Sequence, residues 1–190
     1  MLNQSDSSSG AVTKSDATKL RILEAAQDLF SRRGYAETGV REICEMAEIN
    51  QALVTRYFGS KLGLVEQRLD ACFDVTIFTD LEPENFGQAL ADTFFATPPE
   101  AAHAVPALVY AAADSEAREI ALALLKRRIL VPLGQWFGTS EAEQRTAQLL
   151  IIVTGFFIYR LMLPLDALQG STTAHMRDWL ADTLQAVVDR

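Results

Sequence analysis

Residues 51–56 carry side chains that could read the edges of DNA bases. Glutamine suits adenine, arginine suits guanine, and small side chains suit the methyl group of thymine. An exposed short helix of any other protein can be similarly polar. The base-reading hypothesis therefore depends on the sequence pattern around these residues. The candidates for base reading are Gln51, Ala52, Thr55 and Arg56.

Three further residues could contact a phosphate backbone. Lys61 follows Ser60, a predicted helix cap, so its ammonium group and the first N–H groups of that helix could bind one phosphate together. Arg41 is another cation close to the base-reading candidates. Tyr57 can donate its hydroxyl to a phosphate, although core packing is the alternative reading of this residue.

Two short helices are needed to position these side chains. One apolar stripe consists of Val40, Ile43 and Ala47, and a second consists of Ile49, Leu53, Tyr57 and Phe58. Gly39 with Glu42, Asn50 and Ser60 supply start signals for helices near residues 40, 51 and 61. Two such helices bury their stripes against each other and a preceding helix, which is the helix-turn-helix arrangement.

A longer helix precedes the two short ones. Ser15 or Asp16 can cap its start, and Gly34 can end it. Its inward face is predicted from helical spacing to contain Ile22, Leu23, Ala26, Leu29 and Phe30. Residues 1–14 begin with a Ser-rich stretch that lacks the features of a signal peptide, and we expect a disordered tail there.

The pattern Val40-x-x-Ile43-x-x-x-Ala47-x-Ile49-Asn50, followed by Tyr57-Phe58-Gly59-Ser60-Lys61-x-x-Leu64, resembles the DNA-binding signature of the tetracycline-repressor (TetR) family. The resemblance covers roughly residues 17–69. Three positions depart from the family pattern: Glu48 replaces a glycine, Gly39 replaces a threonine, and Thr55 replaces a tyrosine. The resemblance also marks Thr38 as a phosphate-contacting position.

The resemblance implies an all-α protein with two parts. An N-terminal three-helix DNA-binding domain over residues 15–60 precedes a larger helical domain over 61–190 that binds an effector and dimerises. The implied function is a ligand-responsive regulator, usually a repressor, that binds a pseudo-palindromic operator as a dimer. The alternatives are an activator or constitutive DNA binder without an effector, and a small-molecule-binding or interaction module that has lost DNA affinity.

Composition and charge agree with a cytoplasmic protein that binds DNA only at specific sites. The net charge is −8, but residues 14–70 hold nine basic and nine acidic side chains, whereas residues 71–190 hold eight and fifteen. Such a distribution disfavours non-specific coating of nucleic acid. The longest apolar run, residues 149–159, is shorter than the roughly 20 residues that a membrane span needs. The two cysteines are expected to be core residues.

The remainder of the chain reads as helices over about 60–78, 83–97, 100–113, 115–137, 141–163 and 173–189, with kinks at Pro106 and Pro132. Kinked helices pack imperfectly and leave room for cavities. His103 could orient a ligand, and a surface position is the alternative reading of this residue. Arg128 belongs to a run of basic residues that we expect to face mainly solvent. The candidate effector pocket comprises Phe73, Ile77, Phe94, Phe95, His103, Tyr110, Arg128 and Trp136.

Residues 149–159 are apolar around the whole circumference of a helix, so we expect burial on two sides. One side would pack on its own chain, and the other would join the last helix in a four-helix bundle between two subunits. The candidate dimer interface comprises Ile152, Gly155, Phe156, Tyr159, Leu180 and Leu184.

Catalysis and metal binding find no support in the sequence. A phosphate-binding loop, a nucleotide fingerprint and a nucleophile motif are all missing. His103 and His175, the two histidines, lack a second ligand at helical spacing. We therefore predict a non-enzymatic protein without a cofactor or metal ion.

Overall fold

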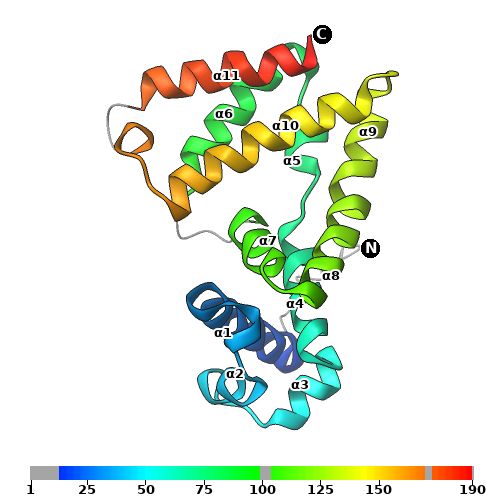
Figure 1. The fold of residues 1–190 in the computed structure, drawn as a ribbon, viewed down its shortest axis with the longest axis vertical. Helices are drawn as coiled ribbons and strands as arrows, with labels where there is room; N and C mark the ends of the chain where they lie inside the picture. Colours follow the sequence, from blue (N-terminus) through cyan, green and yellow to red (C-terminus); the bar gives the residue numbers. More distant parts are fainter. Residues whose placement is uncertain (1–12, 99–103, 170–172, 190) are drawn as a thin grey trace, which may run out of the picture.

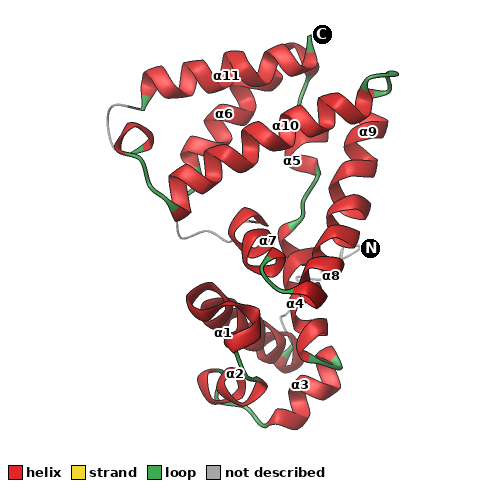
Figure 2. Cartoon of the chain, viewed as in Figure 1, coloured by secondary structure: helices red, strands yellow, loops and turns green. Residues whose placement is uncertain are grey.

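The computed structural model describes residues 13–98, 104–169 and 173–189, and the described elements are all helical (Figure 2). The prediction of an all-α protein is therefore confirmed. The α-helices are α1 (Lys14–Glu37), α2 (Val40–Met46), α3 (Gln51–Phe58), α4 (Lys61–Cys72), α5 (Thr76–Thr79), α6 (Phe86–Ala96), α7 (Ala104–Ala112), α8 (Ser115–Leu125), α9 (Val131–Phe137), α10 (Ala142–Phe157) and α11 (Ala174–Val188).

The helices form two groups joined through α4 and α1. Figure 1 shows α1, α2 and α3 together at one end of the molecule, and α6, α10 and α11 at the opposite end. Helix α4 contacts α1 and α3 on one side and packs against α7 and α8 on the other. Helix α1 also contacts α7, so both α1 and α4 connect the three-helix group to the rest of the fold.

Local hydrogen bonds account for the ends of α1. Thr13, rather than Ser15 or Asp16, caps its start: the Asp16 N–H donates to Thr13 Oγ1 at 3.1 Å, and the Thr13 hydroxyl donates to Asp16 Oδ2 at 2.7 Å. Gly34 has φ of 80° and interrupts the helix, as predicted, before a last turn that reaches Glu37.

The caps predicted for α2, α3 and α4 are present. The Gly39 N–H donates to Glu42 Oε2 at 2.8 Å, the Ala52 N–H to Asn50 Oδ1 at 2.8 Å, and the Gly63 N–H to Ser60 Oγ at 3.1 Å. The bond from the Gly39 N–H lowers the pKa of the Glu42 carboxyl. The Arg33 guanidinium, with Nη1 2.7 Å from Glu42 Oε1, lowers this pKa further. Each cap satisfies a backbone donor that its helix leaves unpaired.

Helix α4 is shorter than predicted. It ends at Cys72, and Phe73 adopts an extended conformation instead of continuing toward Phe78. Asp74 Oδ1 then accepts bonds from the N–H and the hydroxyl of Thr76, at 3.0 and 2.6 Å, and α5 begins there. This side-chain interaction competes with continuation of the helix.

The interruption predicted near Pro132 takes the form of a π-helical turn. Residues Lys126–Leu130 form this turn between α8 and α9, and the Val131 N–H donates to the Lys126 carbonyl. A second π-helical turn, Ile158–Met162, follows α10 and ends before Pro164. Pro106 lies in the first turn of α7 as described, a position where proline costs no hydrogen bond within that helix.

The core of the larger group is built on α6. The side chains of Phe86, Leu90 and Phe94 recur at helical spacing on α6 and are buried. Phe94 stacks on Phe156, with ring centroids 5.7 Å apart, and Phe86 packs against Trp136 at 5.3 Å. Aromatic contacts therefore connect α6 to α10 and to α9.

Replacing Gly87 by alanine is expected to destabilise the fold by about 1–3 kcal/mol, because overpacking a tight contact forces the backbone apart. A Cβ atom at position 87 would overlap the carbonyl oxygen of Ala181 and lie 2.7 Å from the backbone nitrogen of Gln185 on α11. Gly134→Ala is the matched control, since a Cβ atom there meets nothing within 4 Å. Urea unfolding that gives equal stabilities for the two variants would contradict this close crossing of α6 and α11.

Candidate nucleic-acid interface and effector cavity

Helix α3 presents one polar face to solvent. Val54 and Phe58 are buried against the rest of the three-helix group, which turns the opposite side of α3 outward. The exposed side carries the predicted base-reading residues, which recur at helical spacing: Gln51, Ala52, Thr55 and Arg56. Packing therefore selects the same side of α3 as the sequence chemistry does.

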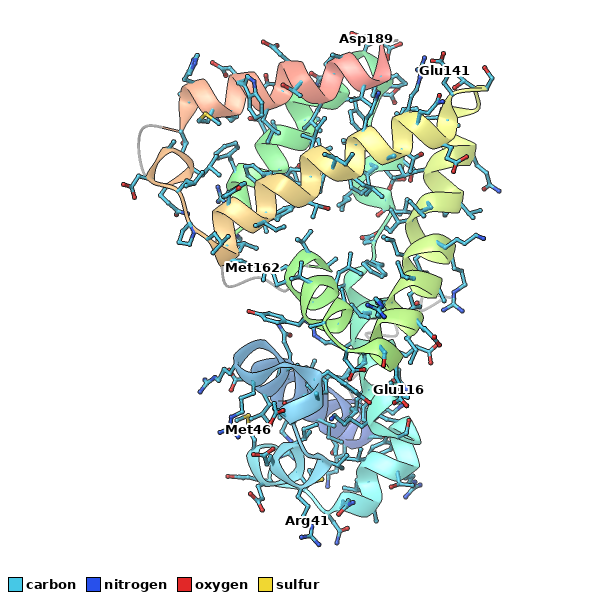
Figure 3. All side chains as sticks on the ribbon, in the orientation of Figure 1. Arg41, Met46, Glu116, Glu141, Met162 and Asp189 are labelled. Atoms are coloured by element: carbon cyan, nitrogen blue, oxygen red, sulfur yellow. The ribbon has the colours of Figure 1, made fainter. Side chains whose placement is uncertain are left out.

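Arg41 on α2 lies at the same end of the molecule as α3. Figure 3 shows its side chain directed away from the body of the protein. Arg41 is exposed, so it can reach a phosphate beside a groove occupied by α3. Its role as a phosphate contact stays a prediction.

Lys19 of α1 is a residue near this surface that the sequence did not single out. Its Nζ lies 5.5 Å from the ring centroid of Tyr57, and the Arg56 guanidinium lies 6.0 Å from the same ring. Tyr57 is half-buried, so its ring packs and also approaches two cations. The helical spacing of α1 alone could not reveal that Lys19 neighbours α3.

The structure corrects the prediction for Thr38. This side chain is 1% exposed, and its hydroxyl donates to the Gly34 carbonyl at 2.8 Å. It therefore connects the broken end of α1 to the start of α2. A hydroxyl that is buried and already bonded has no access to a phosphate.

Lys61 is directed toward the junction between the two groups of helices. Its Nζ lies 4.0 Å from the ring centroid of Tyr35. Burial lowers the pKa of Lys61, while Asp114, Glu37 and Glu42 favour its charged form. Because Asp114 caps the start of α8, this ammonium group lies near an acidic part of the larger group rather than reaching freely into solvent. The phosphate contact predicted for Lys61 would require a different side-chain conformation.

Glu48 occupies the turn between α2 and α3 with φ of 52°. Residues other than glycine are strained in this left-handed region. We predict that Glu48→Gly raises the free energy of unfolding by about 0.5–1 kcal/mol, because it relieves this strain. Glu45→Gly in α2 removes the same charge from a helical position and is expected to destabilise by about 1 kcal/mol. Loss of stability in both variants on urea unfolding would exclude strain at Glu48.

A cavity of about 380 Å³ lies among the helices of the larger group. Three of the predicted effector-pocket residues line it: Phe73, Ile77 and Phe94. The other lining residues are Ala71, Cys72, Asp74, Phe78, Thr93, Thr97, Ala104, Val105, Leu108, Leu125, Ile129, Leu150, Val153, Thr154 and Phe157. Ligand sites of proteins commonly have this size and this excess of apolar side chains.

Four predicted pocket residues lie elsewhere. Phe95 packs on Phe156 with centroids 5.1 Å apart, and Trp136 packs on Phe86. Arg128 is exposed and pairs with Asp70 at 3.3 Å, while Tyr110 is half-buried outside the cavity wall. His103 lies outside the described residues. The prediction is corrected for Phe95, Tyr110, Arg128 and Trp136, because none of them lines the cavity.

Family comparisons now bear on both groups of helices. Residues 22–67 match the bacterial regulatory proteins of the tetR family, and residues 84–188 match the tetracyclin repressor-like C-terminal domain. The second match alone spans more than half of the chain. The chain belongs to the TetR family. This family consists of transcriptional regulators rather than enzymes, in agreement with the sequence prediction.

Curated relatives match over a short stretch of the chain. The chain is 49% identical over 49 residues to the HTH-type transcriptional repressor Rv3405c of Mycobacterium tuberculosis, which is 26% of either chain. It is 36% identical over 61 residues to the HTH-type transcriptional regulator TtgR of Pseudomonas putida. The chain thus spans about a quarter of the length of the curated relatives that it matches.

A solved structure extends the likeness to nearly the whole chain. GusR of Salmonella enterica superposes with a TM-score of 0.65 at 20% identity, over 93% of this chain and 96% of that one. At such low identity the comparison shows the TetR fold alone.

The TetR-family chain exposes apolar side chains along α10 and α11. Ile151 of α10 is 71% exposed and Trp179 of α11 is 53% exposed. A groove between the two helices is lined by Gln148, Ile151, Ile152, Asp182, Thr183, Ala186 and Val187. By length and composition, Ala142–Met162 could cross a membrane, with 28% of the apolar window buried. Here this stretch packs against α9 and α11 on one side.

Predicted dimer residues divide between the outer face of α10 and α11 and the core. Tyr159 is exposed, and Ile152 and Gly155 are half-buried. Phe156, Leu180 and Leu184 are buried within the single chain, so they have little surface to offer a second subunit. For these three positions the structure revises the prediction, because they face inward toward α6 and its neighbours.

Proposed function

We propose that this chain is a DNA-binding transcriptional repressor that acts as a homodimer and is released from its operator by a small-molecule effector. The observation that carries the proposal is the exposed face of α3, with Gln51, Thr55 and Arg56 presented by a family-typical helix-turn-helix. Glutamine and arginine on one exposed helical face suit direct reading of bases in the major groove.

Dimerisation would use the outer face of α10 and α11. Exposed large apolar side chains on one surface commonly mark an interaction site. Two chains joined through this face in two-fold symmetry would present two α3 helices to half-sites that are about 34–36 Å apart. The operator is therefore expected to be pseudo-palindromic.

Effector release would act through α4. Ala71 and Cys72 in the last turn of this helix line the cavity, whereas its first turn begins beside α3. A ligand that favours a different tilt of α4 would change the separation of the two α3 helices in the dimer. A coupling of about 1–3 kcal/mol weakens operator binding by 5- to 150-fold.

Selection of bound sequences from random DNA duplexes tests the proposal. We expect enrichment of a two-fold symmetric sequence at moderate salt. The neutral charge of residues 14–70 favours a rival function, a small-molecule-binding module without DNA affinity. Failure to enrich any palindrome would support that rival and contradict the repressor.

Release by an effector needs a separate measurement, which is a ligand titration with and without saturating operator. Linkage is reciprocal, so operator must weaken ligand binding by the same factor by which ligand weakens operator binding. Equal ligand affinities in the two titrations would remove the release mechanism and leave DNA binding intact.

A further inference from the structure

We infer that the cavity selects an apolar molecule bearing a cationic or hydrogen-bond-donating end and rejects anions. This inference names the ligand class for the effector site and therefore rests on the proposed function. The chemistry of the cavity wall supports this inference. The described wall combines apolar side chains with hydrogen-bond acceptors, and its charged side chain is the carboxylate of Asp74.

The apolar part of the wall suits an aromatic or aliphatic body. Phe73, Phe78, Phe94 and Phe157 reach the cavity from four different segments, and aliphatic side chains fill the rest of the wall. The Phe94 and Phe157 rings meet nearly edge to face, with centroids 4.9 Å apart. Burial of an apolar ligand surface here would supply most of the affinity.

Two of the three threonine hydroxyls in the described wall, those of Thr93 and Thr97 but not that of Thr154, are used as donors to backbone carbonyls. The Thr93 hydroxyl donates to the Ala89 carbonyl at 2.8 Å, and the Thr97 hydroxyl donates to the Thr93 carbonyl at 2.7 Å. Their hydroxyl protons are thereby used, while their oxygens retain lone pairs that can accept. A ligand that offers N–H or O–H groups fits these positions better than one that offers only acceptors.

Asp74 is the charged residue of the described lining, which contains no Lys, Arg or His. The side chain lies at the exposed rim. Both hydrogen bonds from Thr76 reach Oδ1, at 3.0 Å from the N–H and 2.6 Å from the hydroxyl. These bonds lower the pKa of Asp74, first through the Thr76 hydroxyl, so the carboxylate is ionised at neutral pH. Neither of these two bonds uses Oδ2.

Three of the nearby arginines are held by other groups, whereas Arg68 lies near Cys72 with its Nε unpartnered but is not part of the described lining. Arg127 and Arg128 pair with Asp70 at 3.5 and 3.3 Å. Arg160 donates to the carbonyls of Phe95 and Thr97 at 3.0 and 3.3 Å. Arg128 still attracts the Asp74 carboxylate from a distance. These arginines thus reduce the negative potential at the rim without supplying a donor among the described lining residues.

Three probes that share one apolar body test the inference in full-length protein without DNA: para-butylbenzylamine, para-butylbenzyl alcohol and para-butylbenzoate. At neutral pH they are a cation, a neutral donor and an anion. Because Asp74 is exposed, its charge should have only a modest effect on affinity. Calorimetry should show the amine binding about fivefold tighter than the alcohol, and the benzoate binding about fivefold more weakly than the alcohol.

Asp74→Asn should reduce the gap between amine and benzoate to about twofold, since the amide oxygen can still accept from Thr76 while the charge is lost. Asp80→Asn is the matched control: it removes an exposed carboxylate outside the cavity wall and should leave the gap unchanged. A gap that persists in Asp74→Asn, or that closes equally in both variants, would overturn the role of Asp74.

Cysteine labelling locates the bound probe. Cys72 lines the cavity and Cys44 lies in the three-helix group, so the amine should slow alkylation of Cys72 alone. Equal affinities for amine and alcohol, tightest binding of benzoate, absence of binding by all three probes, or an unprotected Cys72 would each overturn the inference. Binding in the expected order without any effect on operator affinity would keep the ligand class and contradict release instead.

Discussion

An Ile151→Glu variant is expected to be monomeric and to lose specific operator binding. The Ile151 side chain is 71% exposed and lines the groove between α10 and α11, so the variant carboxylate stays in water in the isolated chain. In a dimer joined through this face, two carboxylates would be buried without partners, which costs several kcal/mol. Sedimentation velocity should show one monomeric species.

Operator affinity should fall in Ile151→Glu because the dimer is lost. A monomer holds one half-site, and its affinity is expected to drop to the range of non-specific binding, about 10⁻⁴–10⁻⁶ M at physiological salt. Leu122→Glu is the matched control, because Leu122 of α8 is 57% exposed and lies outside the groove. If Ile151→Glu sediments like the Leu122 variant, the outer face of α10 and α11 is not the dimer interface.

Sequence reasoning predicted the three-helix group well because short-range hydrogen bonds determine it. Asn50 and Ser60 cap helices through partners two and three residues away, so their roles are visible in the sequence. The buried residues Val54 and Phe58 then orient α3 by packing alone. Helical spacing and caps together are sufficient to place the base-reading candidates on the exposed side.

The end of α4 carried a local signal that was missed. Asp74 and Thr76 form a side-chain turn that begins α5, and the Asp-x-Thr pattern is typical of such turns. The apolar residues Phe73 and Ile77 continue the helical spacing of α4, which led to a predicted helix as far as Phe78. Periodicity indicates burial, but it does not show where a backbone changes direction.

The cavity wall could be predicted only in part because tertiary partners decide which aromatic residues remain available. Trp136 is an aromatic residue of the kind that often lines a pocket, but it packs on Phe86. Arg128 pairs with Asp70. Leu108 and Val153 line the cavity although nothing distinguishes them from other aliphatic core residues. Such assignments depend on contacts between residues far apart in the chain, which helical spacing does not contain.

Arg56→Ala is expected to weaken operator binding by about 1–3 kcal/mol per half-site, and to relax the base preference at one position in each. Arg56 is exposed on the outer side of α3, one helical turn beyond Ala52, and its guanidinium lies 6.0 Å from the Tyr57 ring centroid. A guanidinium in this place can form two parallel hydrogen bonds to guanine, which alanine cannot replace. Binding to the selected operator and to all single-base variants measures both effects.

Arg41→Ala provides the contrast, since a phosphate contact carries no sequence information. This variant should weaken all sequences alike and reduce the slope of log affinity against log salt by about one per half-site. Arg56→Ala should instead change the order of preferred sequences. Because both residues are exposed cations on the three-helix group, loss of charge alone would affect the two variants equally. An unchanged base preference in Arg56→Ala would therefore assign Arg56 to the phosphate backbone and leave Gln51 and Thr55 as the side chains that read the operator.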